Sequence, residues 1–286
     1  MSHVFPVPTL DHVVVNTRDR LDEAADTYRR LGFTLTPRRY HSLGSVNHLA
    51  IFGTDYLELI GAESGDIRPG VSSRPEILNA PLGLDGLVFG TQDAAATYER
   101  LRRQDVAIDP PQQFSRPVDI GDGPRAAVFR TTRLPRASVP AGRLYFCEHL
   151  THELVWRDEW RHHANGTVGV ARAVIAAEDP NTLGRTFGRM FGEPTVRATD
   201  DGCSLILGLS RFDVVTPAAL WELFGDAAPD SRGRSDYMAA LTLRTLSLDA
   251  AETALEAGGV RGLDRIGTSV LVPAAEAFGV TLEFSV

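Results

Sequence analysis

A repeated pattern of expected strands and helices constrains the fold of this 286-residue chain more than any other sequence feature. In residues 10–61 the β-branched run LDHVVV is typical of a strand, and apolar residues at helical spacing follow it and end at Gly32. Three short apolar stretches complete this unit, and similar units begin near residues 84, 168 and 237. Each unit has an expected helix cap, at Asp19, Asp93, Asp179 and Ser247. These caps are spaced by 74, 86 and 68 residues, which indicates four internal repeats.

The repeat is too long for a solenoid, whose units span about 20–50 residues. We therefore expect each unit to be a half-barrel that pairs with a neighbour. The predicted class is α+β, with four βαβββ-type modules in two pairs and the fourth module shortened. The polar, turn-rich segment DEWRHHANG separates the pairs, so the expected domains are 1–165 and 166–286. The proline-rich stretches at 69–81 and 110–124 are expected to be loops.

The composition excludes several function classes. The net charge of −8 and the lack of a basic stripe argue against nucleic-acid binding, and no apolar run approaches the ~20 residues of a membrane span. All 29 basic residues are arginine, so neither Schiff-base catalysis by lysine nor a P-loop is possible. The N-terminus does not look like a secretion signal, so a cytoplasmic location is expected, and the arginine bias indicates a GC-rich bacterial source.

Two residues of the first unit are candidate metal ligands, one in its first strand and one in its last. Glu58 lies between Leu57 and Leu59, where a carboxylate is costly unless it faces water, an ion or a partner. His12 lies in the LDHVVV strand. Two simpler interpretations stay open at this point: a strand histidine held by a backbone hydrogen bond, and a glutamate that faces solvent.

The segments HSLGSVNHLAIFGTDYLELIG (41–61) and CEHLTHELVWRDEW (147–160), together with LDHVVV, resemble the vicinal oxygen chelate superfamily, and its glyoxalase-like group most of all. That superfamily includes glyoxalase I, extradiol dioxygenases, fosfomycin-resistance proteins and bleomycin-binding proteins. The resemblance covers the first 165 residues; beyond them it rests on the pattern and on the closing GVTLEF. It implies open, curled mixed β-sheets that form a cup, with helices on the outside.

In this superfamily the first and fourth strands of each paired module supply the metal ligands. Carried onto this chain, these positions are His12 and Glu58 in the first module, and Gly86, which offers no ligand, in the second. The remaining position is His149 or Glu148. Alternation along the strand favours His149, although a register slip of one residue would exchange the two.

The resemblance thus implies a divalent ion (Zn, Fe, Ni or Mn) held by His12, Glu58 and His149 in a lyase, isomerase or dioxygenase that acts on a small molecule. Glu148 or His48 would move protons. The expected substrate contacts are His41, Asn47 and Trp156. The second pair of modules lacks such histidines and is expected to be structural, and the protein to be a monomer or homodimer.

Two alternatives are kept. Without a metal, the cup would sequester an antibiotic-like ligand, as in the bleomycin-binding branch; a structural or regulatory module is the third possibility.

Overall fold

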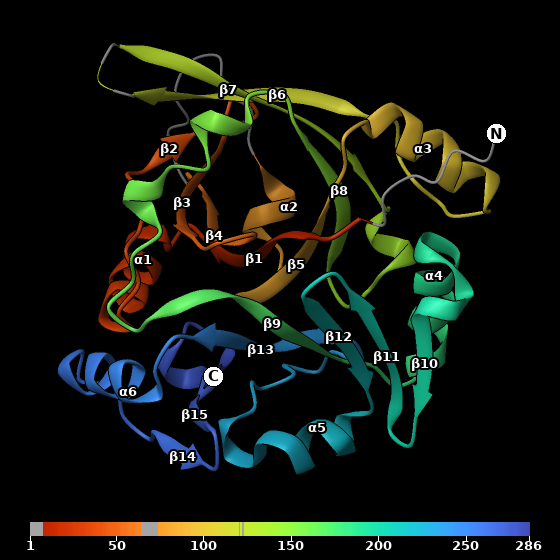
Figure 1. Ribbon diagram of the computed structural model, residues 1–286. Helices are drawn as coiled ribbons and strands as arrows, with labels where there is room; N and C mark the ends of the chain where they lie inside the picture. The colour runs from red at the N-terminus through yellow and green to blue at the C-terminus, as the bar shows by residue number, and fades with distance from the viewer. Residues whose placement is uncertain (1–7, 64–73, 120, 122) are drawn as a thin grey trace.

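The computed structural model describes residues 8–63, 74–119, 121 and 123–286 as two eight-stranded mixed sheets with helices around them (Figure 1). The first sheet contains β1 (Leu10–Arg18), β2 (Arg39–Tyr40), β3 (Ser45–Ile51), β4 (Tyr56–Ala62), β5 (Gly83–Gly90), β6 (Gln112–Asp119), β7 (Pro124–Arg133) and β8 (Arg143–His149). The second contains β9 (Thr167–Ala176), β10 (Val196–Thr199), β11 (Gly202–Leu207), β12 (Ser210–Val215), β13 (Tyr237–Thr245), β14 (Asp264–Ile266), β15 (Ser269–Val272) and β16 (Thr281–Ser285).

The α-helices are α1 (Leu21–Arg30), α2 (Pro75–Leu78), α3 (Ala94–Arg103), α4 (Pro180–Phe191), α5 (Pro217–Phe224) and α6 (Leu248–Ala257). Short 3-10 turns lie at η1 (Arg136–Ser138), η2 (His152–Leu154), η3 (Asp158–Trp160), η4 (Glu193–Thr195), η5 (Gly225–Ala227) and η6 (Ala274–Glu276). Asp93, Asp179 and Ser247 cap α3, α4 and α6 as expected. The cap expected at Asp19 is wrong. Helix α1 instead starts after Arg20, with no side-chain cap, and Arg20 pairs with Glu23.

The sheet order confirms the four-module architecture. The strands follow the order β2-β3-β4-β1-β5-β8-β7-β6 in the first sheet and β10-β11-β12-β9-β13-β16-β15-β14 in the second. In every module the first strand pairs in parallel with the last, and the two modules of a sheet join through antiparallel first strands, β1 with β5 and β9 with β13. The fourth module keeps all its elements, but its last three strands are short.

One expected loop is a strand. The proline-rich stretch 110–124 contains β6, which pairs with β7 from Gln112 to Asp119. A proline is tolerated there because β6 is the edge strand of its sheet, where Pro117 leaves no inner ladder bond unmade. In the other stretch, residues 75–78 form the helical turn α2, while residues 69–73 lie outside the described part of the chain.

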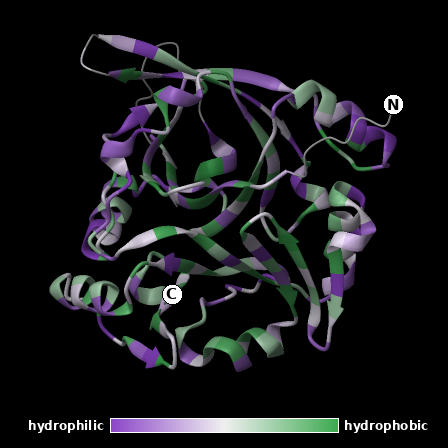
Figure 2. Ribbon diagram, in the orientation of Figure 1, coloured by the Kyte–Doolittle hydropathy of each residue, from purple (hydrophilic) through white to green (hydrophobic). Residues whose placement is uncertain are grey.

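Alternation along each strand divides the apolar residues between a shared core and a cup. Val13 and Val15 point to a core that both sheets share, and Phe89 of the first sheet meets Phe212 of the second there, with ring centroids 5.5 Å apart. His12 and Val14 point to the opposite, concave face of the first sheet. In Figure 2, green hydrophobic residues are interspersed with white and purple ones along the strands of both sheets.

Candidate functional site

His12 and Glu58 lie on the same face of the first sheet and reach each other inside its cup. The parallel register of β1 and β4 sets His12 beside Tyr56 and Val14 beside Glu58, so the two polar side chains share a face one row apart. Both are buried, with 3% and 6% of the residue exposed. The His12 Nε2 and Glu58 Oε2 atoms are 3.7 Å apart.

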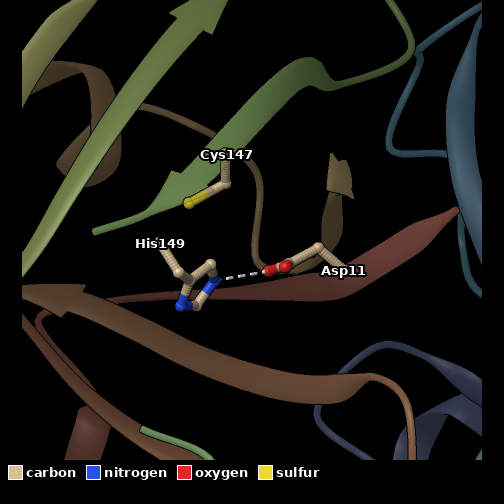
Figure 3. A group of neighbouring side chains, drawn as sticks. All are labelled: Asp11, Cys147 and His149. Atoms are coloured by element: carbon tan, nitrogen blue, oxygen red, sulfur yellow. Dashed lines mark hydrogen bonds and ion pairs between the residues drawn. The ribbon is translucent and has the colours of Figure 1, made fainter. Parts of the chain in front are cut away.

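Asp11 holds the other nitrogen of His12. The register between β1 and β5 shifts between Leu10 and His12, so Asp11 occupies a bulge, where simple alternation fails. Its Oδ1 atom lies 2.5 Å from His12 Nδ1 and 3.1 Å from His149 Nε2, so one carboxylate oxygen joins two imidazoles. Figure 3 shows the contact with His149. The sequence analysis missed Asp11, because a bulge leaves no trace in the period-2 pattern.

The charge state of Asp11 fixes the roles of these nitrogens. Burial by itself raises the pKa of the Asp11 carboxyl, but the charge of His149 and the hydrogen bonds from His12 and His149 outweigh burial and hold the pKa below its ordinary value. Asp11 is therefore an ionised acceptor, and His12 donates to it from Nδ1. In the neutral imidazole this leaves Nε2 with its lone pair directed into the cup.

Glu58 is also held in its ionised form. Burial acts to raise the pKa of its carboxyl, but His12, His41 and a hydrogen bond from Asn47 lower it below the ordinary value. That hydrogen bond joins Asn47 Nδ2 to Glu58 Oε1 at 2.6 Å. Tyr145 completes the group, because its hydroxyl, whose pKa is raised by burial, donates to His12 Nε2 at 3.2 Å.

The expected substrate contacts occupy different places around the cup. His41 and Asn47 both line the cavity, and His41 Nδ1 lies 2.8 Å from Ser45 Oγ. Trp156 packs edge-on against Tyr56, at 5.5 Å between ring centroids, and stacks on His152.

The two expected proton-transfer residues lie on the other face of the sheet. Glu148 Oε2 accepts a hydrogen bond from the backbone N–H of Ala94 at the start of α3, and the His48 imidazole lies 2.7 Å from the Thr36 carbonyl oxygen. Each is next to a residue that lines the cup (Cys147 and Asn47), so alternation turns it away. The geometry gives neither of them a place beside His12 and Glu58.

The third expected ligand, His149, belongs to a different group of donors. A group of this kind has three or more His, Cys, Asp or Glu side chains whose ligand atoms lie within 4.8 Å of one another. In the described part of the chain, one such group is present: Asp11, Cys147 and His149. Figure 3 shows the His149 ring and the Asp11 carboxylate facing each other, with the Cys147 sulfur close by on β8. His149 Nδ1 is buried and has no hydrogen-bond partner among the described residues. His12 and Glu58 thus form a two-donor pair beside a second possible metal site.

Packing explains why position 86 holds glycine and not a residue with a metal-binding side chain. A Cβ atom at this position would lie 2.9 Å from Val14 Cβ, closer than real side chains approach. Val14 is fully buried in the cup-facing cluster of apolar residues. A larger residue at 86 would need a shift of β1 itself.

The comparisons with known proteins agree with this architecture. The model of the family described as "Glyoxalase-like domain" matches residues 10–191. No curated protein matches the chain. Within the described residues no helix is long and apolar enough to span a membrane.

Solved structures share the fold at low identity. A hypothetical protein from Staphylococcus aureus is 13% identical with a TM-score of 0.65, and the match covers 98% of this chain and 99% of that one. A Mn(II)-bound glyoxalase from Novosphingobium aromaticivorans is 12% identical, with a TM-score of 0.56 over 99% and 83% of the two chains. A variant of homoprotocatechuate 2,3-dioxygenase from B. fuscum is 12% identical, with a TM-score of 0.51 over 100% and 73%.

The family match, which spans more than half of the chain, and the shared fold confirm the resemblance seen in the sequence: the chain belongs to the glyoxalase-like domain family of the vicinal oxygen chelate superfamily.

Proposed function

We propose that this protein is a metal-dependent enzyme that acts on a small molecule in the cup of the first sheet. The observation that carries the proposal is the approach of His12 Nε2 to Glu58 Oε2, at 3.7 Å, with Asp11 behind His12. Histidine ligands of metals commonly donate their other N–H to a carboxylate, which fixes the tautomer and orients the ring. The Asp11–His12 contact has this form.

The donor set fits a divalent ion with open coordination positions. Imidazole nitrogen and carboxylate oxygen suit Zn, Fe, Ni or Mn, and two protein donors leave room for two neighbouring substrate oxygens. We assign His12 and Glu58 as the main ligands of the ion. His149, which contacts Asp11, would either be a third ligand or leave that coordination position to water. When bound, such an ion would supply Lewis-acid chemistry for a lyase, isomerase or dioxygenase reaction.

The protein side chains around the pair have definable tasks. Asn47 fixes the Glu58 carboxylate through Oε1 and leaves Oε2 directed toward His12. The Tyr145 hydroxyl, which retains its proton, is positioned to donate to an oxygen that replaces His12 Nε2 as its partner.

Metal analysis of protein purified without chelators tests this proposal. We expect about one equivalent of a transition metal in the wild type, loss of metal in His12→Ala and Glu58→Gln, and retention in His162→Ala, whose side chain is exposed. Less than half an equivalent in the wild type that reconstitution does not restore would overturn the proposal. Loss of metal in Cys147→Ser with retention in Glu58→Gln would move the ion to the group in Figure 3.

A second candidate function is metal-free binding of a small molecule. It is favoured by the steric exclusion of a ligand at Gly86 and by the separation of His149 from the His12–Glu58 pair. In this case His12→Ala would retain ligand affinity, and no metal would be found under any reconstitution condition.

A further inference from the structure

Arg116 is a buried cation that has no anionic partner in the described part of the chain. It lies on β6 two residues beyond Phe114, on the face that lines the cup, and only 4% of it is exposed. Within the described residues no hydrogen bond or ion pair reaches its guanidinium, which lies over the Phe129 ring at 5.6 Å. A buried charge is costly unless it is paired, so this position is a poor one for stability alone.

A second arginine of the cup, Arg133, is half-buried and also has no carboxylate partner among the described residues. Arg133, at the end of β7, lies over the Tyr145 ring at 5.1 Å, and its one hydrogen bond to a described residue is a long one, 3.4 Å from Nε to Thr131 Oγ1. Burial lowers the pKa of its guanidinium, as it does for Arg116. Burial is the largest cause of both pKa shifts, and it outweighs the opposing influence of Glu58 on Arg116 and of Tyr145 on Arg133.

The other two arginines of the cavity differ in having their own carboxylates. Arg74 pairs with Glu76, and Arg143 Nε lies 3.0 Å from Asp85 Oδ2, although Arg143 Nη2 is buried without a partner. Glu58 is the one acidic side chain among the described residues that line the cavity, and Asn47 and His12 already engage it. Among the described residues that line it, the cup therefore carries an excess of positive charge that belongs to Arg116 and Arg133.

His41 does not add to this charge. Burial lowers its pKa to about 4, with Glu58 opposing the shift and Arg116, Arg74 and Arg133 adding to it, so His41 is neutral at physiological pH. Arg116 and Arg133 both line the cavity together with His41.

Aromatic and aliphatic side chains line the part of the cavity between these polar groups. Phe114 and Phe129 stack with ring centroids 5.4 Å apart, and Leu49, Ile60 and Tyr56 line the cup as well. The enclosed part of the cavity has a volume of about 40 Å³ and opens toward solvent, so it would hold the anionic group of a ligand while the apolar body extends into the mouth.

We propose that the cup binds an organic oxyanion, a carboxylate or a phosphate ester on an apolar body, and that Arg116 and Arg133 hold its anionic group. Guanidinium groups match such anions through paired N–H donors. The inference deepens the proposed function, since it names the substrate class of the same cup, but it depends on the arginines and not on a bound metal.

Titration calorimetry in the presence of a chelator tests the inference with three probes: benzoate, phenyl phosphate and the neutral benzamide. We expect at least one of the two anions to bind wild type at least tenfold more tightly than benzamide, and the stronger anion identifies the group that the site prefers. Arg116→Gln and Arg133→Gln should each lower the affinity for that anion at least tenfold. Arg125→Gln, an exposed position on β7, serves as the matched control and should change nothing.

Three results would each overturn the inference. Wild type could bind benzamide as tightly as the anions, or it could show no detectable anion binding at 10 mM. Both arginine variants could also bind the anion with an affinity within twofold of wild type. Thermal unfolding checks that each variant is folded, and Arg116→Lys, which keeps the charge, should bind more tightly than Arg116→Gln. Because the chelator removes any metal, a failure of metal binding would refute the proposed function and leave this result intact.

Discussion

Replacing Asp11 by asparagine tests the orientation of His12 in the proposed metal site. A single oxygen of Asp11, Oδ1, lies 2.5 Å from His12 Nδ1 and 3.1 Å from His149 Nε2. Asparagine keeps one carbonyl oxygen that can occupy this place, so the change removes the charge and leaves the shape. Loss of such a supporting carboxylate typically lowers metal affinity 10- to 100-fold, or about 1.4–2.7 kcal/mol.

The measurement is metal affinity by competition with a chelating dye, for wild type, Asp11→Asn and a control, Asp26→Asn. Asp26 is an exposed residue of α1 that pairs with Arg29. We expect the control to match wild type. An Asp11→Asn affinity within twofold of wild type would refute the orienting role of Asp11. A loss above 1,000-fold that Cys147→Ser reproduces would instead make Asp11 a direct ligand.

Three further predictions concern stability. Gly86→Ala should lower the free energy of unfolding by about 1–3 kcal/mol in urea because its Cβ would collide with Val14; unchanged stability would contradict the packing account. Asp85→Ala should lower the free energy of unfolding by about 3–5 kcal/mol in the same assay, because it leaves Arg136 and Arg143 without the carboxylate, only 2% exposed, that both contact. A decrease below about 1 kcal/mol would refute this. Burial raises the pKa of Asp55 to about 6 from an ordinary 3.8, so the folded state binds its proton more tightly; unfolding free energy should fall as pH rises from about 4 to 6, and Asp55→Asn should flatten that slope.

The fold was predictable because its signal is repeated four times. A module boundary that is ambiguous once becomes clear when caps recur at similar spacing, and the sheet order follows from pairing the modules. The shared face of His12 and Glu58 was predictable for a similar reason, since both lie in strands whose alternation is regular over the relevant residues.

The parts that could not be predicted depend on local exceptions to these periodicities. A register shift at Asp11 brings its carboxylate to His12 and His149, where the regular alternation of the strand does not predict it. Arg116 was hidden because prolines made its edge strand resemble a loop. Glu148 and His48 were expected from their chemistry and from their places in the family-like segments, and their hydrogen bonds to Ala94 and Thr36 show that they face away from the cup.

The shared core of the two sheets has a consequence for how the protein changes over evolutionary time. Rings from opposite halves meet at Phe89 and Phe212 and again at Phe33 and Phe284, and Asp55 Oδ1 accepts a hydrogen bond from the Val170 backbone across the junction. Each half is thus part of the interior of the other, and calorimetry should record a single melting transition for the whole chain. Two halves joined in this way can change the residues on their concave faces independently, while the core that they share keeps them together.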